Sequence, residues 1–589
     1  MDNDTTDAGD EIVNYLGVLD YVILAFVVLI AAVTGIYHGF AKGGQTTTEE
    51  FLVADRSMFS LPIAMTLLAS FISPITILGK PAEIYTYGGQ YFVFIICHLL
   101  LFPAIAFIFI PVFHGLRITS AYEYLKLRFG LPLQICGAGI FMLQTSFYMA
   151  IVLYSPALAI EFVTSFGLWK TVMIGGIVCT FYTSLGGMKA VIWTDVIMFV
   201  VIFGTTVMVI VTGVVKAGGV GHVWETNKEA GRLDLIQFPW DPTQRMTFLN
   251  LVIGGFMNSL PMWAVSQTAV QRFLAAKSIK DAQASIWLNL PFVSLLLFLI
   301  DYEGLVLYTF YNEAPNVPPN VTKSDQIIIH FVSEQFGHVP GYQGLFIACL
   351  WAGTLSTISS GLNAMIAVTL EDMVKPFRRW QANRNNTEVV EDDRSDTFKS
   401  KLLTCVYGAI SIFLAFLAAE MGTLVSMANS VFGAAGGPLL AAFTQGMMWK
   451  RANSAGTLAG VIVGFIFGVW ITFGAMLSGD DPDTFWLYKI SFMWYATITW
   501  AISTIVSIIG SEVYRYFKPQ EKEEPIDPSL LVTFLRPRDV YETVELAVVS
   551  NNRTNQSGGG NMESEGEDGD LKEYTVHKRS LAQTAENQC

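Results

Sequence analysis

Long hydrophobic stretches, separated by short polar loops, follow one another along most of this chain. The stretches 21–36, 91–113 and 191–215 are typical, because each carries almost no charged residue. An α-helix rises 1.5 Å per residue and needs about 20 apolar residues to cross a hydrocarbon core of about 30 Å. A single stretch of this kind could be a buried core helix, but a repeated series indicates membrane spans. The pattern predicts an all-α polytopic membrane protein with about thirteen transmembrane helices.

The apolar stretches also set the expected domain organisation. Residues 1–15 are predicted to be an extracellular N terminus, 16–511 a transmembrane transporter domain, and 512–589 a cytoplasmic, largely disordered tail rich in glycine and acidic residues. The expected spans are residues 16–40, 58–79, 91–113, 133–160, 168–186, 190–214, 248–265, 285–310, 341–370, 402–419, 424–449, 455–477 and 489–511.

Lysine and arginine are distributed unevenly between alternate loops. The loops with the larger share include the cluster of Lys375, Arg378 and Arg379. The positive-inside bias places these loops in the cytoplasm and therefore the N terminus outside the cell. Glycosylation sequons at Asn3 and Asn320 fall on the predicted outer face, where both could accept sugar.

Composition agrees with a lipid-facing protein, since 52% of the residues are hydrophobic and only 14% are charged. The net charge of −14 excludes a nucleic-acid binder. The six cysteines form neither a disulfide framework nor a zinc-binding spacing, and no phosphate loop or nucleophile motif occurs. We therefore expect neither an enzyme nor a cofactor, and we interpret Glu371 and Asp372 as solvated charges at a helix end. The oligomeric state is left open.

Two of the predicted spans contain helix-breaking residues. The second has Pro74 in the middle of the hydroxyl-containing segment 69–76, and the seventh has Gly254 and Gly255 followed by the polar segment 258–263 with Pro261. Such residues are common in membrane helices and could be simple kinks. However, secondary transporters place their binding sites at interrupted helices of two internal repeats, and these spans lie five helices apart. The arrangement predicts a five-plus-five inverted-repeat core, with repeats at about 58–214 and 248–449.

The ninth span contains five hydroxyl side chains in the nine residues 353–361. Hydroxyl and carbonyl oxygens are the ligands that a hard cation selects. From Gly353 only a backbone carbonyl could serve as a ligand. Close helix packing by small residues is the simpler account of Thr354, Ser359 and Ser360.

These residues resemble the sodium:solute symporter family, in the branch of sodium-coupled monocarboxylate, multivitamin and iodide transporters. The resemblance implies a thirteen-helix, LeuT-like inverted-repeat transporter that works by alternating access with sodium as the coupling ion. It is carried by the segments 69–73 (ASFIS), 119–125 (TSAYEYL), 186–195 (GGMKAVIWTD), 270–272 (VQR) and 353–357 (GTLST).

The resemblance also implies site residues. The family's main sodium site falls on the carbonyls of Ala69, Ile72 and Gly353 and on the hydroxyls of Ser356 and Thr357. Asp195 is a candidate for a further cation site. The substrate pocket falls on Ser73, Thr76, His98, Tyr148 and Trp263. Aromatic packing is the alternative for Tyr148 and Trp263, and a hydrogen-bonded core histidine is the alternative for His98.

The chain departs from the family pattern at Lys80, His98, Asp301 and Glu303, which argues against iodide as the solute. Two buried acids in one span are expensive unless water or a partner reaches them. We expect a sodium-coupled symporter that imports a small organic anion, a monocarboxylate or a carboxylate vitamin, across the plasma membrane. An iodide or other small-anion symporter, and a channel-like or regulatory relative without coupled transport, are the alternatives.

Overall fold

A computed structural model describes most of the hydrophobic part of the chain. The described residues are 16–40, 52–164, 166–312, 321, 323–385, 393–418, 422–478, 483–518 and 526–535. The predicted extracellular segment 1–15, the glycosylation candidates Asn3 and Asn320, and the tail beyond 535 lie outside them.

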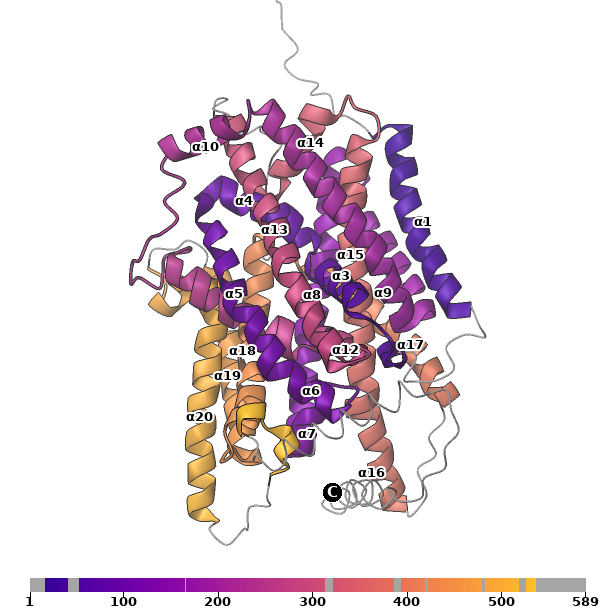
Figure 1. Ribbon diagram of the computed structural model, residues 1–589, viewed down its shortest axis with the longest axis vertical. Coiled ribbons are helices and arrows are strands. Elements are labelled where there is room, and N and C mark those ends of the chain that lie inside the picture. Colours follow the sequence, from indigo (N-terminus) through magenta and orange to yellow (C-terminus); the bar gives the residue numbers. More distant parts are fainter. Residues whose placement is uncertain are drawn as a thin grey trace, which may run out of the picture. The chain divides into compact units, whose positions relative to one another are not determined.

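The structure is built from helices (Figure 1). The α-helices are α1 (Val18–Phe40), α3 (Ser60–Phe71), α4 (Pro74–Tyr87), α5 (Phe94–Ala104), α6 (Ile110–Leu116), α7 (Glu123–Phe129), α8 (Leu131–Val163), α9 (Leu168–Lys216), α10 (Val220–Glu229), α11 (Gly255–Leu260), α12 (Gln267–Leu274), α13 (Ile279–Asn312), α14 (Ile327–Phe336), α15 (Tyr342–Val368), α16 (Lys375–Asn385), α17 (Asp393–Ala418), α18 (Leu424–Met448), α19 (Ser454–Ser478) and α20 (Tyr495–Phe517). Short π-helical segments are η4 (Ile105–Phe109), η5 (Asn250–Gly254), η6 (Pro261–Val265) and η8 (Thr369–Val374).

The chain divides into two compact units. The larger unit comprises Met1–Met373 and Asp392–Thr533 and holds the helical bundle, whereas the smaller comprises Val374–Glu391 and Phe534–Cys589 and holds α16. All residues discussed below belong to the larger unit.

The helices coincide with the predicted spans, which confirms an all-helical polytopic membrane protein. Nine helices of the described residues are long and apolar enough to cross a membrane, or ten if the bent pair α3 and α4 is one span. The predicted spans 16–40, 168–186 and 248–265 are helical but are not among these ten. The number thirteen therefore stays a prediction.

The last helix of the bundle, α20, extends beyond the predicted start of the tail. The tail is predicted from residue 512, but α20 continues to Phe517. Residues 526–533 then return to the bundle, where the Val532 N–H donates to the Met447 carbonyl at 3.1 Å and the Tyr124 hydroxyl donates to the Leu530 carbonyl at 3.1 Å.

One predicted break is confirmed and the other lies elsewhere. The axes of α3 and α4 differ by 58°, with the break at Ile72 and Ser73, as the Pro74 segment predicts. In the seventh predicted span the segment 250–265 is helical throughout, and the chain leaves the helix only at Ser266, which is extended with φ −65° and ψ 135°. Placing the break at Gly254–Gly255 and 258–263 was wrong. Pro261 lies inside this continuous helix, at the point where a π-helical turn accommodates its missing N–H.

α15 lies at the centre of the larger unit. It contacts α1, α3, α8, α9 and α17, and nearly all of its side chains are buried. Its small residues account for this, because glycine, serine and threonine let neighbouring helices approach closely. The helix that sequence analysis marked as rich in hydroxyls is therefore surrounded by protein rather than lipid.

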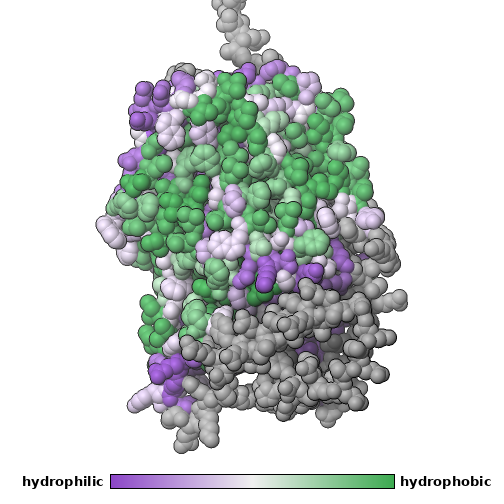
Figure 2. All heavy atoms as spheres, in the orientation of Figure 1, coloured by the Kyte–Doolittle hydropathy of each residue, from purple (hydrophilic) through white to green (hydrophobic). Residues whose placement is uncertain are grey.

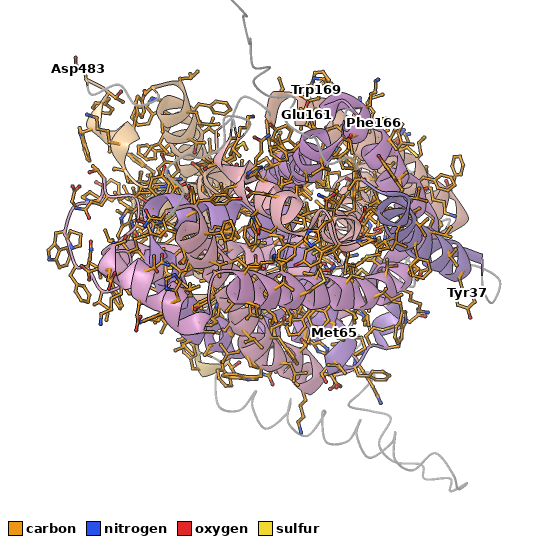
Figure 3. All side chains as sticks on the ribbon, turned by 90° about the horizontal axis from the view of Figure 1, so that it is seen from above. Tyr37, Met65, Glu161, Phe166, Trp169 and Asp483 are labelled. Carbon is orange, nitrogen blue, oxygen red and sulfur yellow. The ribbon has the colours of Figure 1, made fainter. Side chains whose placement is uncertain are left out.

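The outer surface of the bundle is apolar. Figure 2 shows a broad band of hydrophobic residues over the helices, and exposed side chains such as Phe26, Leu99, Phe107 and Ile466 contribute to the apolar surface. Seen from above, Phe166 and Trp169 lie at the rim of the bundle, where exposed aromatic rings are typical of a membrane interface (Figure 3). The exposed surface matches a lipid environment.

Small residues line the contact between α19 and α20. Gly456, Gly460 and Gly464 are spaced by four residues on α19, and a side chain at any of them would overlap α20. At Gly460 an added Cβ would lie 2.0 Å from the Ser507 Oγ and 2.3 Å from the Ser503 carbonyl. The two backbones can pack this closely only because glycine has no Cβ.

Gly460→Ala is expected to destabilise the protein by about 1–3 kcal/mol through overpacking, lowering the midpoint of thermal unfolding of the detergent-solubilised protein. Gly139→Ala on α8 is the control, since an added Cβ there meets no atom within 4 Å. Alanine's better helix propensity should leave this control neutral or stabilised. Equal midpoints for the two variants would contradict the packing described for α19 and α20.

Candidate functional site

The break between α3 and α4 exposes backbone carbonyl groups in the middle of the bundle. The last helical hydrogen bond of α3 runs from the Ile72 N–H to the Leu68 carbonyl at 2.9 Å, and Ile72 itself has φ −87° and ψ 90°. Ser73 is extended, and Pro74 opens α4 without an N–H to donate. The last carbonyls of a helix, here including that of Ala69, lose their intrahelical partners.

α15 faces this break with the residues predicted to bind sodium. A Cβ placed on Gly353 would lie 3.3 Å from the Ile72 carbonyl oxygen, so the two backbones meet at this point. The Thr357 hydroxyl donates to the Ser70 carbonyl at 3.1 Å, which leaves its oxygen lone pairs available to a cation. The structure thus brings Ile72 and Gly353 together and places Thr357 beside the end of α3.

Ser356 completes this group on α15. Its hydroxyl is buried and makes no hydrogen bond of acceptable geometry with the described residues, although it lies close to the Asp195 carboxyl group. A buried hydroxyl without a partner costs free energy, so an additional ligand at this position would be favoured.

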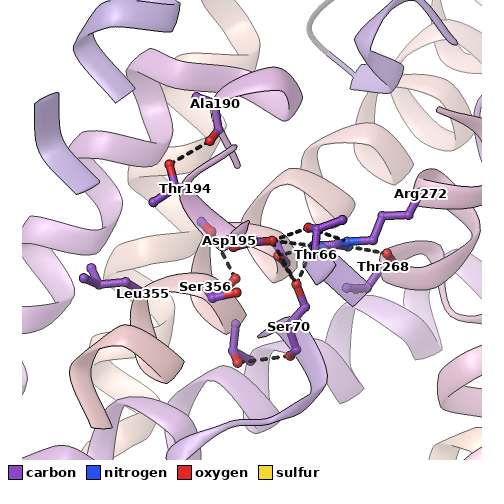
Figure 4. Close-up of polar contacts among 12 residues, drawn as sticks. Thr66, Ser70, Ala190, Thr194, Asp195, Thr268, Arg272, Leu355 and Ser356 are labelled. Carbon is purple, nitrogen blue, oxygen red and sulfur yellow. Dashed lines mark hydrogen bonds and ion pairs between the residues drawn. The ribbon is translucent and has the colours of Figure 1, made fainter. Parts of the chain in front are cut away.

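Asp195, the candidate for a further cation site, lies in a buried polar cluster with Arg272 (Figure 4). The Arg272 guanidinium donates to the Asp195 Oδ2 at 3.3 Å and to the hydroxyls of Ser70 and Ser360, each at 2.5 Å. The Thr66 hydroxyl also donates to Oδ2. The other carboxylate oxygen, Oδ1, has no partner among the described residues. A further cation at Asp195 would therefore have only Oδ1 as an uncommitted ligand.

A pocket adjoins both breaks. It is lined by Ser70 and Phe71 at the end of α3, by Ser266 at the second break, and by Tyr148 and Thr357 from α8 and α15. Of the predicted substrate residues, Tyr148 lines the pocket and packs edge-on against Phe432 with ring centroids 4.8 Å apart. The predicted substrate residues Ser73, Thr76, His98 and Trp263 are not among the lining residues.

A chain of aromatic contacts connects the remaining candidates to the break. Phe71 contacts Trp263 with centroids 4.3 Å apart, Trp263 contacts Phe102 at 5.3 Å, and Phe102 stacks on His98 at 5.4 Å. The His98 Nδ1 atom is buried without a hydrogen-bond partner among the described residues. The alternative of a core histidine hydrogen-bonded to a neighbouring helix therefore has no support at Nδ1. Ser73 is the N-cap residue of α4, although its side chain makes no capping hydrogen bond, and it lies near the Tyr148 hydroxyl.

Asp372 is not a solvated end charge, and this interpretation was wrong. Its carboxylate is fully buried and accepts hydrogen bonds from the Gln134 amide at 2.6 Å and from the Ser120 hydroxyl. The π-helical segment η8 places the carboxylate against α8 and the segment before α7. Gln267, at the start of α12, accepts a hydrogen bond from the Ala121 N–H at 2.7 Å, so α12 is tied to the same segment. Glu371 is partly exposed, as expected.

The segment η7 (Ser324–Gln326), together with Lys323 before it, joins α4, α8 and α18. Asp325 accepts a hydrogen bond from the Leu424 N–H of α18 at 3.1 Å, and Lys323 donates to the Tyr154 hydroxyl of α8 at 2.7 Å. Burial raises the pKa of Asp325 to about 6, against the lowering effect of the Leu424 N–H. η7 also contacts α4, which is the part of the broken helix that follows the break.

Sequence reasoning assigned no role to Arg272, Thr66, Ser70 or Gln144, although the structure places each of them at the site. The sequence offers little signal for Arg272, because the segment around it, QTAVQRFL, is amphipathic rather than apolar, and its burial follows from tertiary packing.

The fold and the site define a class of protein: a helical membrane transporter with interrupted helices around a pocket lined by both apolar and hydroxyl-bearing side chains. Comparison with known proteins agrees with this class. The model of the sodium:solute symporter family matches residues 51–464. Sodium-coupled monocarboxylate transporter 1 of Homo sapiens is 41% identical over 79% of this chain and 75% of its own. The sodium-dependent multivitamin transporter of Oryctolagus cuniculus is 39% identical over 80% of this chain and 72% of its own.

A solved structure gives the same result. The substrate-bound, outward-open state of a Na⁺-coupled sialic acid symporter superimposes with a TM-score of 0.73 and 25% sequence identity, covering 84% of this chain and 98% of that one. The chain belongs to the sodium:solute symporter family. It is a sodium-coupled solute symporter and not an enzyme.

Removing one partner of the buried Arg272–Asp195 pair is expected to be strongly destabilising. Arg272→Met leaves the Asp195 carboxylate buried and unpaired, at a cost of about 3–5 kcal/mol. The measurement is the thermal unfolding midpoint of the purified protein. Lys189→Met is the control: Lys189 pairs at 3.0 Å with Asp55, whose side chain is 50% exposed, so this change should cost less than about 1 kcal/mol. A similar midpoint for both variants would show that the buried cluster does not stabilise the bundle.

Proposed function

We propose that this symporter imports a small organic anion, a monocarboxylate or a carboxylate vitamin, across the plasma membrane. The observation that carries the proposal is the close approach of Gly353 to the Ile72 carbonyl, with the Thr357 hydroxyl beside it and an adjoining pocket of apolar and hydroxyl-bearing side chains. Two relatives, named for transport of monocarboxylates and of multivitamins, support this choice of solute.

The proposed sodium site consists of five oxygens. They are the carbonyls of Ala69, Ile72 and Gly353 and the hydroxyls of Ser356 and Thr357. Neutral hard oxygens suit a monovalent cation, and the unpartnered Ser356 hydroxyl is a ligand already desolvated. The unpartnered Asp195 Oδ1 supports a further cation position next to it.

The proposed solute site lies at the start of α4. The N-terminus of this 14-residue helix carries partial positive charge and favours a carboxylate, with Ser73 and Thr76 in its first turn. The Tyr148 hydroxyl lies near Ser73. His98 and Trp263 would cover the solute from α5 and η6, where they are linked through Phe102.

The proposed transport cycle uses the predicted topology. With thirteen spans and a five-plus-five core, the N terminus is outside, the tail is inside, and sodium moves inward with the solute. One charge crossing 100 mV gains about 2.3 kcal/mol, so the electrical gradient drives accumulation. Sodium binding to oxygens of the break would order the unwound backbone that the solute also needs, so each would raise the affinity for the other.

Uptake of radiolabelled lactate, nicotinate and biotin into cells expressing the chain tests the function. Uptake of at least one carboxylate is expected to fall to background when external sodium is replaced by an impermeant cation, because the solute then lacks its coupling ion. Untransfected cells and sodium-dependent uptake of iodide are the controls. Full uptake without sodium would refute coupled transport, and exclusive uptake of iodide would refute the organic anion.

Replacing both hydroxyls of the proposed sodium site tests its residues. Ser356→Ala with Thr357→Ala should raise the sodium concentration for half-maximal transport by about tenfold or more, since two ligands are lost. Thr354→Ala is the matched control on α15, because its hydroxyl is buried but donates to the Leu350 carbonyl of its own helix. Unchanged sodium dependence in the double variant would remove Ser356 and Thr357 from the site.

A further inference from the structure

Lys80 is a buried cation on α4, the part of the broken helix that follows the break. Only 6% of its surface is exposed. Its ammonium group lies 3.1 Å from Asp301 Oδ1 and 3.4 Å from Oδ2 on α13. It also lies over the rings of Tyr91 and Phe94, 4.4 Å and 5.3 Å from their centroids. Asp301, which sequence analysis expected to need a partner, has one.

The position of Lys80 relates it to the proposed solute site. Seven residues, or almost two helical turns, separate it from Ser73, so both lie on the same face of α4 about 10 Å apart. Side chains of a helix lean towards its N-terminus, which for Lys80 is the direction of the break. Phe94 contacts both the ammonium group and the His98 ring, whose centroid lies 5.7 Å from its own.

Among the described residues, Asp301 is the counter-ion of Lys80. The neighbouring Glu303 lines an apolar pocket with residues of α9 and α14, on a different side of α13. Glu83, one turn further along α4, is held by Arg245 at 2.5 Å and 3.0 Å. The Lys80 ammonium group therefore lies between the Asp301 carboxylate and the aromatic rings of Tyr91 and Phe94.

Stability alone does not account for this pair. Burying two charges costs several kcal/mol, and well-packed apolar residues in the same place are often as stable or more stable. The rings of Tyr91 and Phe94 attract the ammonium group but leave it weakly solvated. The carboxylate of a solute that reaches Lys80 would meet a desolvated ammonium group. Among the described residues, Asp301 supplies the carboxylate that competes for it.

We propose that Lys80 is a specificity-determining residue of the transport path. Its ammonium group attracts and orients the carboxylate of the solute as it approaches the N-terminus of α4, and Asp301 neutralises the charge when no solute is present. The inference rests on the proposed function and deepens it, because it states which side chain selects anionic over uncharged solutes.

The test compares a carboxylate with its uncharged amide. Uptake of lactate and of biotin, each in competition with lactamide or biotinamide, is measured for the unchanged chain, Lys80→Met and Lys80→Arg. Lys80→Met should raise KM for the carboxylate at least about tenfold through loss of a charge-assisted contact. It should leave the inhibition by the amide and the sodium concentration for half-maximal uptake unchanged. Lys80→Arg should retain most of the preference. Lys170→Met, which removes an exposed lysine on α9, is the control and should change nothing.

A double variant separates selectivity from folding. Lys80→Met alone leaves Asp301 buried and unpaired, so surface expression is measured for every variant. Lys80→Met with Asp301→Leu should restore surface expression but not the carboxylate KM. A normal KM in this double variant would overturn the proposal. Asp301→Asn supplies a second measurement, since Lys80 then loses its competitor and the carboxylate KM should fall; an unchanged or higher KM contradicts the proposal.

The outcomes also distinguish this inference from the function on which it rests. If the unchanged chain takes up no carboxylate with sodium, the proposed function fails and the role of Lys80 fails with it. If sodium-dependent carboxylate uptake is present but has the same KM in Lys80→Met, only the role of Lys80 is overturned.

Discussion

The unwound backbone between α3 and α4 is the constraint on which the rest of the bundle depends. Within a bilayer no water compensates an unpaired carbonyl, so irregular backbone is tolerated only where protein surrounds it. α15 supplies these surroundings. Gly353 lets its backbone approach the Ile72 carbonyl, and the Thr357 hydroxyl donates to the Ser70 carbonyl. The same small and hydroxyl-bearing residues make α15 the most enclosed helix of the bundle, because they allow several neighbours to pack closely around it.

Buried charges impose a second constraint, which the bundle satisfies by pairing helices. Lys80 of α4 is held by Asp301 of α13, and Arg272 of α12 is held by Asp195 of α9. Each pair joins elements far apart in the sequence and next to a break. An uncompensated charge at either place would be expensive, so the elements of each pair cannot separate unless water, an ion or a solute replaces the lost partner.

The sequence predicts the helices well and the site only in part. Apolar stretches of sufficient length predict helices wherever they occur, and Pro74 predicts the first break because it removes a helical hydrogen bond in mid-span. Pro261 leads to a wrong position for the second break, because a π-helical turn accommodates this proline and the chain leaves the helix at Ser266. Asp372 looks solvated in sequence, but its burial depends on Ser120 and Gln134, which lie more than two hundred residues away in the chain. Contacts of this kind follow from tertiary packing, which local patterns do not encode.

The cluster around Arg272 explains how a cation and a conformational change can be coupled in the proposed mechanism. Arg272 follows the second break by six residues, yet its guanidinium donates to Ser70 at the first break and to Ser360 of α15. Moving α12 away from α3 and α15 must therefore break charge-assisted hydrogen bonds between buried side chains. The Asp195 carboxylate would then lose its compensating charge. A sodium ion close to the unpartnered Oδ1 of Asp195 and the Ser356 hydroxyl would supply part of that charge, so occupancy by the ion lowers the cost of the movement.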